Sequence, residues 1–167
     1  MNLRKACPDD AAAIAMVRVD SWRSAYRGIV PDNRLERLDC ARGAERFRDA
    51  IVTGPEELYV TEEGGAITGF LVLGPCRDSD IDARSTGEIW GMYLSSPYWR
   101  RGIGRSMCRE AEGTLKSRGH SGVVLWVFED NQRARRFYEA MGFTSDGARK
   151  VLDIGASLNA VRYRKSI

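Results

Sequence analysis

The sequence predicts a single α/β domain built around a mixed sheet. Its length of 167 residues suits one domain with a real hydrophobic core. The segment 87–128 reads as strand, glycine-rich turn, helix and strand, an order that predicts two parallel strands. Hairpin patterns lie on both sides of it, over 57–74 around Gly64 and Gly65 and over 148–165. We therefore expect parallel pairing in the middle of the sheet and antiparallel pairing toward its ends.

The composition is that of an ordinary globular protein, with 43% hydrophobic and 29% charged residues. A net charge of +3 and a pI near 8.8 lie below the range typical of nucleic-acid-binding domains. No signal peptide opens the chain, and no apolar run reaches the roughly 18 residues of a membrane span. Four scattered cysteines form no CxxC pair and there is one histidine, so we expect no metal. These features predict a reduced, cytoplasmic protein without a membrane partner.

The first third of the chain predicts a strand followed by helices. Residues 2–7 read as a short strand, and Pro8 with the aspartates after it begins a helix over 8–26. The sequence RGIVP ends that helix, and residues 32–51 predict helix again. Residues 76–86 read as a polar loop before the central unit.

Two helices with clear apolar stripes follow the two central strands. The helix over 103–118 ends at Gly119, and a shorter helix over 131–141 begins at Asn131 and ends at Gly142. Their stripes comprise Ile103, Met107, Ala111 and Leu115 in the first, and Ala134, Phe137, Tyr138 and Met141 in the second. Because the strands are parallel, both helices start at the same edge of the sheet.

The turn WRRGIGRSM, residues 99–107, has the features of an anion site. It matches neither the dinucleotide fingerprint nor the nucleotide-triphosphate loop. However, the first turn of a helix leaves backbone N–H groups unpaired, and Gly102 and Gly104 allow a phosphate to approach them. The alternative is a glycine turn with solvated arginines. The second helix start, NQRARRF, adds three more arginines at the same edge, which favours a multiply phosphorylated cofactor.

Three segments carry a resemblance to the GCN5-related N-acetyltransferase (GNAT) family. GEIWGMYLSSPYWRRGIGRSM resembles the family's strand, phosphate loop (Q/R-x-x-G-x-G/A) and helix. VVLWVFEDNQRARRFYEAMGF resembles the next strand and N-x-x-A-x-x-F-Y-x-x-x-G-F. RKACPDDAAAIAMVRVDSWRSAYRGIVP is similar to the family's opening strand and helices. One residue differs from the family's motif: Trp99 occupies the position where the family has Gln or Arg. Since that loop acts largely through backbone amides, we expect the change to be tolerated.

The resemblance implies a fold and a cofactor. The fold is one N-acetyltransferase domain over 1–167, with a mixed, mostly antiparallel, twisted sheet of about six to seven strands, a central splayed parallel pair and about four flanking helices. The cofactor is acetyl-coenzyme A (acetyl-CoA), with its pantetheine arm along the backbone of 92–94 and its pyrophosphate on the amides of 100–105. The cofactor-binding residues that the resemblance implies are Met92, Tyr93, Leu94, Arg100, Arg101, Gly102, Ile103, Gly104, Arg105, Asn131, Ala134, Phe137 and Tyr138.

The implied reaction is acetyl transfer to a primary amine by direct attack in a ternary complex. An amine of pKa near 10.4 must lose a proton first, which costs roughly 4–5 kcal/mol at pH 7. Glu88 resembles the base of this step, either directly or through a water chain, and its alternative is an ordinary strand-edge carboxylate. Tyr138 resembles the acid that protonates the leaving thiolate, and its alternative is a core tyrosine. Cys108 lies in the helix stripe and His120 follows a helix end, so a covalent cysteine route is not favoured.

The acceptor is a small-molecule amine or a peptide or protein amine, and the sequence does not select among them. Trp22, Tyr26 and Trp90 are the acceptor-binding candidates, with core or rim packing as the alternative. The aspartates of the 76–86 loop could attract a cationic amine or belong to a solvated loop. The protein is expected to be a monomer or a homodimer.

Two functions of other classes stay open. A basic module that binds nucleic acid would show steeply salt-dependent binding, but few aromatic residues lie beside the arginines. A non-catalytic acyl-CoA sensor would bind the cofactor without turnover, and the presence of Tyr138 argues against it.

Overall fold

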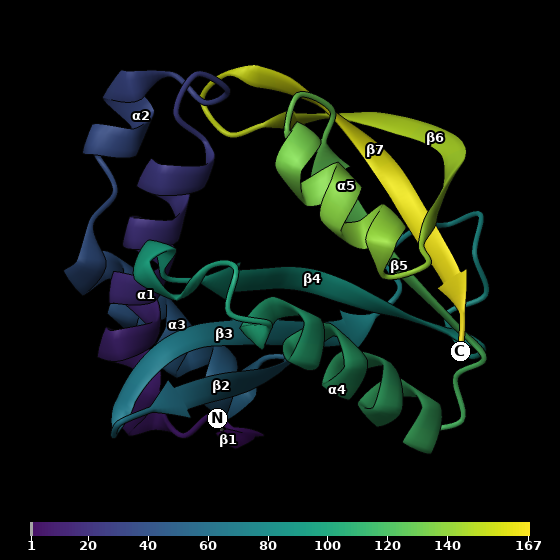
Figure 1. Cartoon of the computed structure of the whole chain (residues 1–167), viewed down its shortest axis with the longest axis horizontal. Helices are drawn as coiled ribbons and strands as arrows, with labels where there is room; N and C mark the ends of the chain where they lie inside the picture. The colour runs from purple at the N-terminus through teal and green to yellow at the C-terminus, as the bar shows by residue number, and fades with distance from the viewer. Residues whose placement is uncertain (1) are drawn as a thin grey trace.

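The computed structural model describes residues 2–167 and contains a seven-stranded sheet with helices on both faces (Figure 1). The strands are β1 (Asn2–Lys5), β2 (Glu57–Glu63), β3 (Ala66–Pro75), β4 (Thr86–Leu94), β5 (Gly122–Phe128), β6 (Thr144–Asp153) and β7 (Ser157–Ser166). The helices are α1 (Ala11–Ala25), α2 (Asp32–Glu36), α3 (Cys40–Thr53), α4 (Ile103–Ser117) and α5 (Gln132–Ala140), with short 3-10 turns at Pro8–Asp10 and Ser96–Tyr98. The strand order is β1-β2-β3-β4-β5-β7-β6.

The two central strands are parallel and pair over only part of their length. Pairing runs from Thr86 opposite Gly122 to Ile89 opposite Leu125, and every other strand pair is antiparallel. Beyond Ile89 the two strands diverge (Figure 1). A bulge on β4 at Trp90, opposite the Val72/Leu73 step of β3, falls where this splay begins. The predicted mixed sheet with a central splayed pair is confirmed.

The hydrophobic core has a layer on each face of the sheet. On one face α4 and α5 pack against β3, β4, β5 and β7, and the predicted stripe of α4 is at most 7% exposed. Cys108 is fully buried in this layer, as predicted. On the other face α1 and α3 cover the β1–β4 half of the sheet. None of the helices in residues 2–167 is long and apolar enough to cross a membrane.

The segment predicted as one helix over 32–51 is two helices. The break falls at Arg37–Asp39, and the Asp39 carboxylate caps α3 by accepting hydrogen bonds from the amides of Ala41 (2.8 Å) and Arg42 (3.2 Å). This aspartate is an N-cap signal that the periodicity alone does not reveal. Strand β6 starts at Thr144, earlier than the predicted 148, and its pairing with β7 is irregular between Ser145 and Arg149.

Candidate active site

The turn before α4 presents unpaired backbone amides beside the splay. Gly102 precedes the helix with φ +81°, and the first helical hydrogen bond runs from the amide of Ser106 to the carbonyl of Gly102. The amides of residues 103–105 therefore have no partner within the helix. Arg100 also has a positive φ of 61°, a conformation that costs a residue with a Cβ about 1–2 kcal/mol. Strain of this kind is typical of functional turns.

The charges around this turn are positive. Arg100, Arg101 and Arg105 are exposed, as is Arg133 in the first turn of α5. Within residues 2–167, none of these four guanidinium groups forms an ion pair. Together with the free amides they create an anion-binding end of the splay.

Trp99 has a side-chain role that the sequence did not reveal. Its indole N–H donates a hydrogen bond of 2.6 Å to the carbonyl of Leu94, which also accepts one of 3.0 Å from the Ser21 hydroxyl. The guanidinium carbon of Arg133 lies 3.6 Å from the centre of the Trp99 ring. Trp99 thus connects the end of β4 to the start of α5. The two hydrogen bonds occupy the Leu94 carbonyl, so this group is not available for the contact with pantetheine that was expected at 92–94.

The start of α5 forms the opposite wall of the splay. Asn131 is 7% exposed, and its side-chain oxygen accepts a hydrogen bond of 3.1 Å from the amide of Ala134, so the predicted N-cap is confirmed. A Cβ added to Gly104 would lie 3.6 Å from the ring of Phe137. The first turn of α4 therefore lies close to Phe137 of α5, beside the space that the resemblance gives to the cofactor.

Tyr138 is a buried phenol with a free hydroxyl. The residue is 8% exposed, and its ring packs edge-on against Phe137 and Phe143, with ring centres 5.1 and 5.6 Å away. Within the described chain its hydroxyl has no hydrogen-bond partner. Burial raises the pKa of this phenol above its ordinary value, with smaller effects from Cys108 and Tyr93. The hydroxyl is therefore a protonated donor without an acceptor.

Glu88 is buried and bound to a single arginine. It is 1% exposed and lies opposite Val124 in the paired part of β4, before the splay opens. Its carboxylate accepts hydrogen bonds from the Arg77 amide (3.0 Å), Nε (3.1 Å) and Nη2 (2.5 Å). A carboxylate offers about four acceptor positions, so about one is left for a water molecule or a substrate.

Two of the predicted acceptor residues meet on the α1 side of the splay. The Tyr26 ring centre lies 5.1 Å from those of both Trp22 and Phe128, and Trp22 lies 6.5 Å from Tyr93. Because Tyr93 is on β4 and Phe128 on β5, this aromatic group spans the two diverging strands. Tyr93 was predicted as a cofactor-binding residue through its backbone, whereas Phe128 was missed, although its position after the paired segment could have indicated it.

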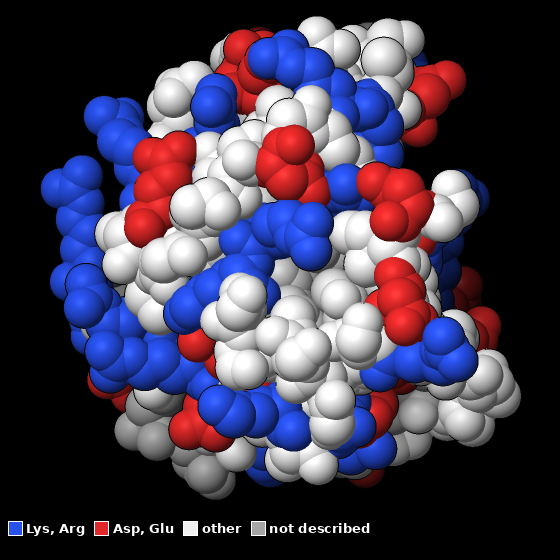
Figure 2. All heavy atoms as spheres, turned by 90° about the vertical axis from the view of Figure 1, so that its right-hand side faces the viewer, with Lys and Arg blue, Asp and Glu red and all other residues white. Residues whose placement is uncertain are grey.

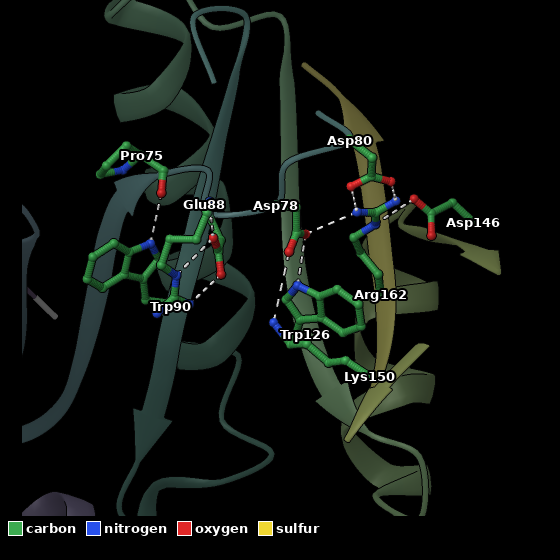
Figure 3. Close-up of polar contacts among 10 residues, drawn as sticks. Pro75, Asp78, Asp80, Glu88, Trp90, Trp126, Asp146, Lys150 and Arg162 are labelled. Atoms are coloured by element: carbon green, nitrogen blue, oxygen red, sulfur yellow. Dashed lines mark hydrogen bonds and ion pairs between the residues drawn. The ribbon is translucent and has the colours of Figure 1, made fainter. Parts of the chain in front are cut away.

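Trp90, the third acceptor candidate, lies apart from this group. Its ring covers Gly74, its N–H donates to the Pro75 carbonyl at 3.1 Å, and the Arg77 guanidinium stacks on it at 4.1 Å. Figure 3 shows it beside Glu88 on β4. Trp90 therefore packs over the β3–β4 part of the sheet, which agrees with the alternative of core or rim packing rather than with acceptor binding.

The acidic loop between β3 and β4 is bound to protein cations rather than free to attract an amine, although the Asp80 and Asp82 side chains remain 63% and 51% exposed. Arg162 of β7 is 6% exposed at its side chain and binds Asp78 (3.1 Å), Asp80 (2.7 Å) and Asp146 (2.8 Å). Figure 3 shows the three carboxylates gathered around its guanidinium. Asp78 also accepts a hydrogen bond of 3.0 Å from the Trp126 indole. These contacts fix the loop that carries Arg77, and with it the partner of Glu88.

Charged groups of both signs are interspersed over most of the face that carries the carboxyl terminus (Figure 2). This mixture is typical of a solvated surface rather than of a uniformly basic nucleic-acid-binding face.

A splayed parallel pair between two positively charged helix starts is the arrangement expected of an acyl-CoA-dependent acetyltransferase. The Acetyltransferase (GNAT) family profile matches residues 17–143, and the chain belongs to this family.

Relatives and solved structures agree with this assignment. The chain is 30% identical over 140 residues to the uncharacterized N-acetyltransferase YuaI of Bacillus subtilis, covering 84% of this chain and 78% of that one. Its fold is similar to the PaiA N-acetyltransferase of Thermoplasma acidophilum in complex with coenzyme A (TM-score 0.76, 19% identity, 99% and 98% of the two chains). It is also similar to YncA, a putative acetyltransferase of Salmonella typhimurium with its cofactor acetyl-CoA (TM-score 0.72, 22% identity, 99% and 93%).

Proposed function

We propose that the protein transfers an acetyl group from acetyl-CoA to a primary amine by direct attack in a complex that holds both substrates. The observation that carries this proposal is that hydrogen-bond donors without a protein acceptor lie on both walls of the splay. Unpaired amides and arginines stand at the start of α4, and the free hydroxyl of Tyr138 stands on α5. These groups suit an extended ligand with phosphates at one end and a leaving thiolate at the other.

The residues present fit acetyl-CoA as co-substrate. The amides of 103–105, with Arg100, Arg101 and Arg105, would hold the pyrophosphate, and Arg133 would add a fourth cation from the opposite wall. The open edge of β4 at Met92 and Tyr93 would hold the pantetheine arm as an added strand. Bound acetyl-CoA supplies the thioester carbonyl, at which a C–N bond forms as the C–S bond breaks.

Proton movement falls to Tyr138 and Glu88. The Tyr138 hydroxyl donates to the departing sulfur, because a phenol is protonated at neutral pH and no protein group among the described residues competes for its hydrogen. Glu88 would hold a water on its remaining acceptor position, and this water would take the amine proton and pass it to the Glu88 carboxylate. The amine itself enters from the α1 side, between Tyr26, Tyr93 and Phe128.

An amine screen tests this function. Protein and acetyl-CoA are mixed with single primary amines, free thiol is measured over time, and the acylated amine is weighed by mass spectrometry. We expect thiol release that depends on the amine and equals the acetylated product. Acetyl-CoA binding without release for any amine would instead support the sensor.

A further inference from the structure

The carboxylates of α1, of β4 and of the β3–β4 loop are engaged by protein groups. The one acidic residue of α1, Asp20, accepts hydrogen bonds from the amide (2.8 Å) and hydroxyl (3.5 Å) of Ser96. The one acidic residue of β4, Glu88, is bound by Arg77. In the β3–β4 loop, Asp78 and Asp80 bind Arg162, and Asp82 binds Arg84. These three segments therefore offer no free carboxylate to a cationic acceptor.

Within the described residues, the partly buried arginine of α1, Arg18, has no partner. Arg18 lies one helical turn before Trp22 on α1, and its guanidinium carbon is 4.4 Å from the centre of the Trp22 ring. The side chain is partly buried, yet within residues 2–167 its guanidinium makes no hydrogen bond and no ion pair. Its helical neighbours three and four residues away, Ala15, Ser21, Ile14 and Trp22, are uncharged.

The partial burial of the Arg18 guanidinium costs free energy, because no anion compensates for the water that it has lost. Burial is the main cause that lowers the pKa of this guanidinium, and the like charge of Arg46 lowers it further. A guanidinium carries five N–H donors in a planar fork that matches a carboxylate. A cation that is partly desolvated and unpaired, and that lies beside the aromatic group at the splay, is a binding-site candidate.

A second hydrogen-bond donor on the same helix stripe also lacks an acceptor. The indole N–H of Trp22 is buried and has no acceptor within the described residues. Trp22 and Tyr26 continue the stripe of Arg18 at intervals of four residues; Trp22 faces Tyr93 of β4, and Tyr26 contacts Phe128 of β5. The stripe therefore runs from a free cation, past a free N–H, to the aromatic group beside the diverging strands.

We propose that the acceptor is an amine that also carries a carboxylate, which Arg18 binds beside Trp22 while the amine points past Tyr26 into the splay. This inference rests on the proposed acetyl transfer and names its substrate class. The Arg18 guanidinium lies 4.4 Å from the Trp22 ring centre, which in turn lies 5.1 Å from that of Tyr26. The carboxylate and the amine are therefore several bonds apart, as in an ω-amino acid or a short peptide.

Matched pairs of acceptors test the proposal. Straight-chain ω-amino acids of increasing length are compared with alkylamines of equal length, and dipeptides and tripeptides with their C-terminal amides. Spermidine serves as the polycation. We expect the best acid to exceed its uncharged partner about tenfold or more in kcat/KM and to exceed spermidine. Equal or better rates for the uncharged partners, or spermidine as the best acceptor, would overturn the proposal while leaving acetyl transfer intact.

Variants show whether Arg18 is the cause. We expect Arg18→Gln to reduce the preference for the acid to within about twofold and to leave the affinity for acetyl-CoA unchanged. Arg18→Lys, which keeps the charge without the planar fork, should fall between the two. Arg109→Gln removes an exposed charge from α4, on the other face of the sheet, and should keep the full preference. A preference that survives in Arg18→Gln contradicts the assignment.

A binding readout keeps the inference separate from turnover. The melting temperature of the CoA-saturated protein is measured with and without each acid, in the wild type and in Arg18→Gln. If acids stabilise the wild type and not the variant, the anion site at Arg18 is supported. If in addition no amine is acetylated, that second result counts against the proposed acetyl transfer and not against the anion site. Absence of stabilisation by every acid, with turnover of uncharged amines, overturns the anion site alone.

Discussion

Tyr138→Phe should lower kcat about 100-fold or more while leaving acetyl-CoA affinity within about twofold, because the variant removes only a proton donor. The phenylalanine ring keeps the contacts with Phe137 and Phe143. No protein hydrogen bond is lost, since the hydroxyl has no partner within residues 2–167. Steady-state kinetics and a cofactor titration on the same preparation give the two numbers.

Tyr59→Phe is the matched control. Tyr59 lies on β2, and its hydroxyl is bonded to Glu57 and Arg118, remote from the splay in the sheet order. Removing that hydroxyl should leave kcat within about twofold. A Tyr138→Phe enzyme with wild-type turnover would remove this hydroxyl from the mechanism.

Arg162→Leu should reduce the free energy of unfolding by about 3–5 kcal/mol, because it leaves buried carboxylates without their cation. The Asp78 and Asp146 side chains are only 12% and 14% exposed, and both rely on this guanidinium. Lys150, 4.0 Å from Asp78, is too far for a strong compensating pair. Urea denaturation of the wild type and the variant measures the difference.

Arg84→Leu provides the comparison for Arg162. Arg84 is 93% exposed at its side chain and pairs with Asp82 on the surface, so its loss should change stability by no more than about 0.5 kcal/mol. A loss below about 1 kcal/mol for Arg162→Leu would show that the three-aspartate cluster does not hold the β3–β4 loop.

Sequence patterns over three to four residues predicted those parts of the site that depend on contacts between residues close in the sequence. The stripe of α4 and the Asn131 cap of α5 depend on residues three to four apart, and the structure confirms both. The parallel pair followed from a strand–helix–strand order, which also set the common edge for the two helix starts.

Contacts distant in the sequence could not be predicted in the same way. Arg162 binds Asp80 from 82 residues away, and nothing in the loop's composition shows that its charges are neutralised. The role of Trp99 depends on the tertiary structure, because β4 positions the Leu94 carbonyl and α5 positions Arg133 within reach of its side chain. Trp90 was grouped with Trp22 and Tyr26 by residue type, but the β4 bulge places it over Gly74 instead.

We propose that the splay between β4 and β5 binds acetyl-CoA through the turn before α4. Calorimetric titration of acetyl-CoA into the wild-type protein tests it most directly. We expect saturable binding of one molecule per chain, accompanied by a rise in melting temperature at saturation. No heat of binding together with no stabilisation at millimolar acetyl-CoA would contradict the claim.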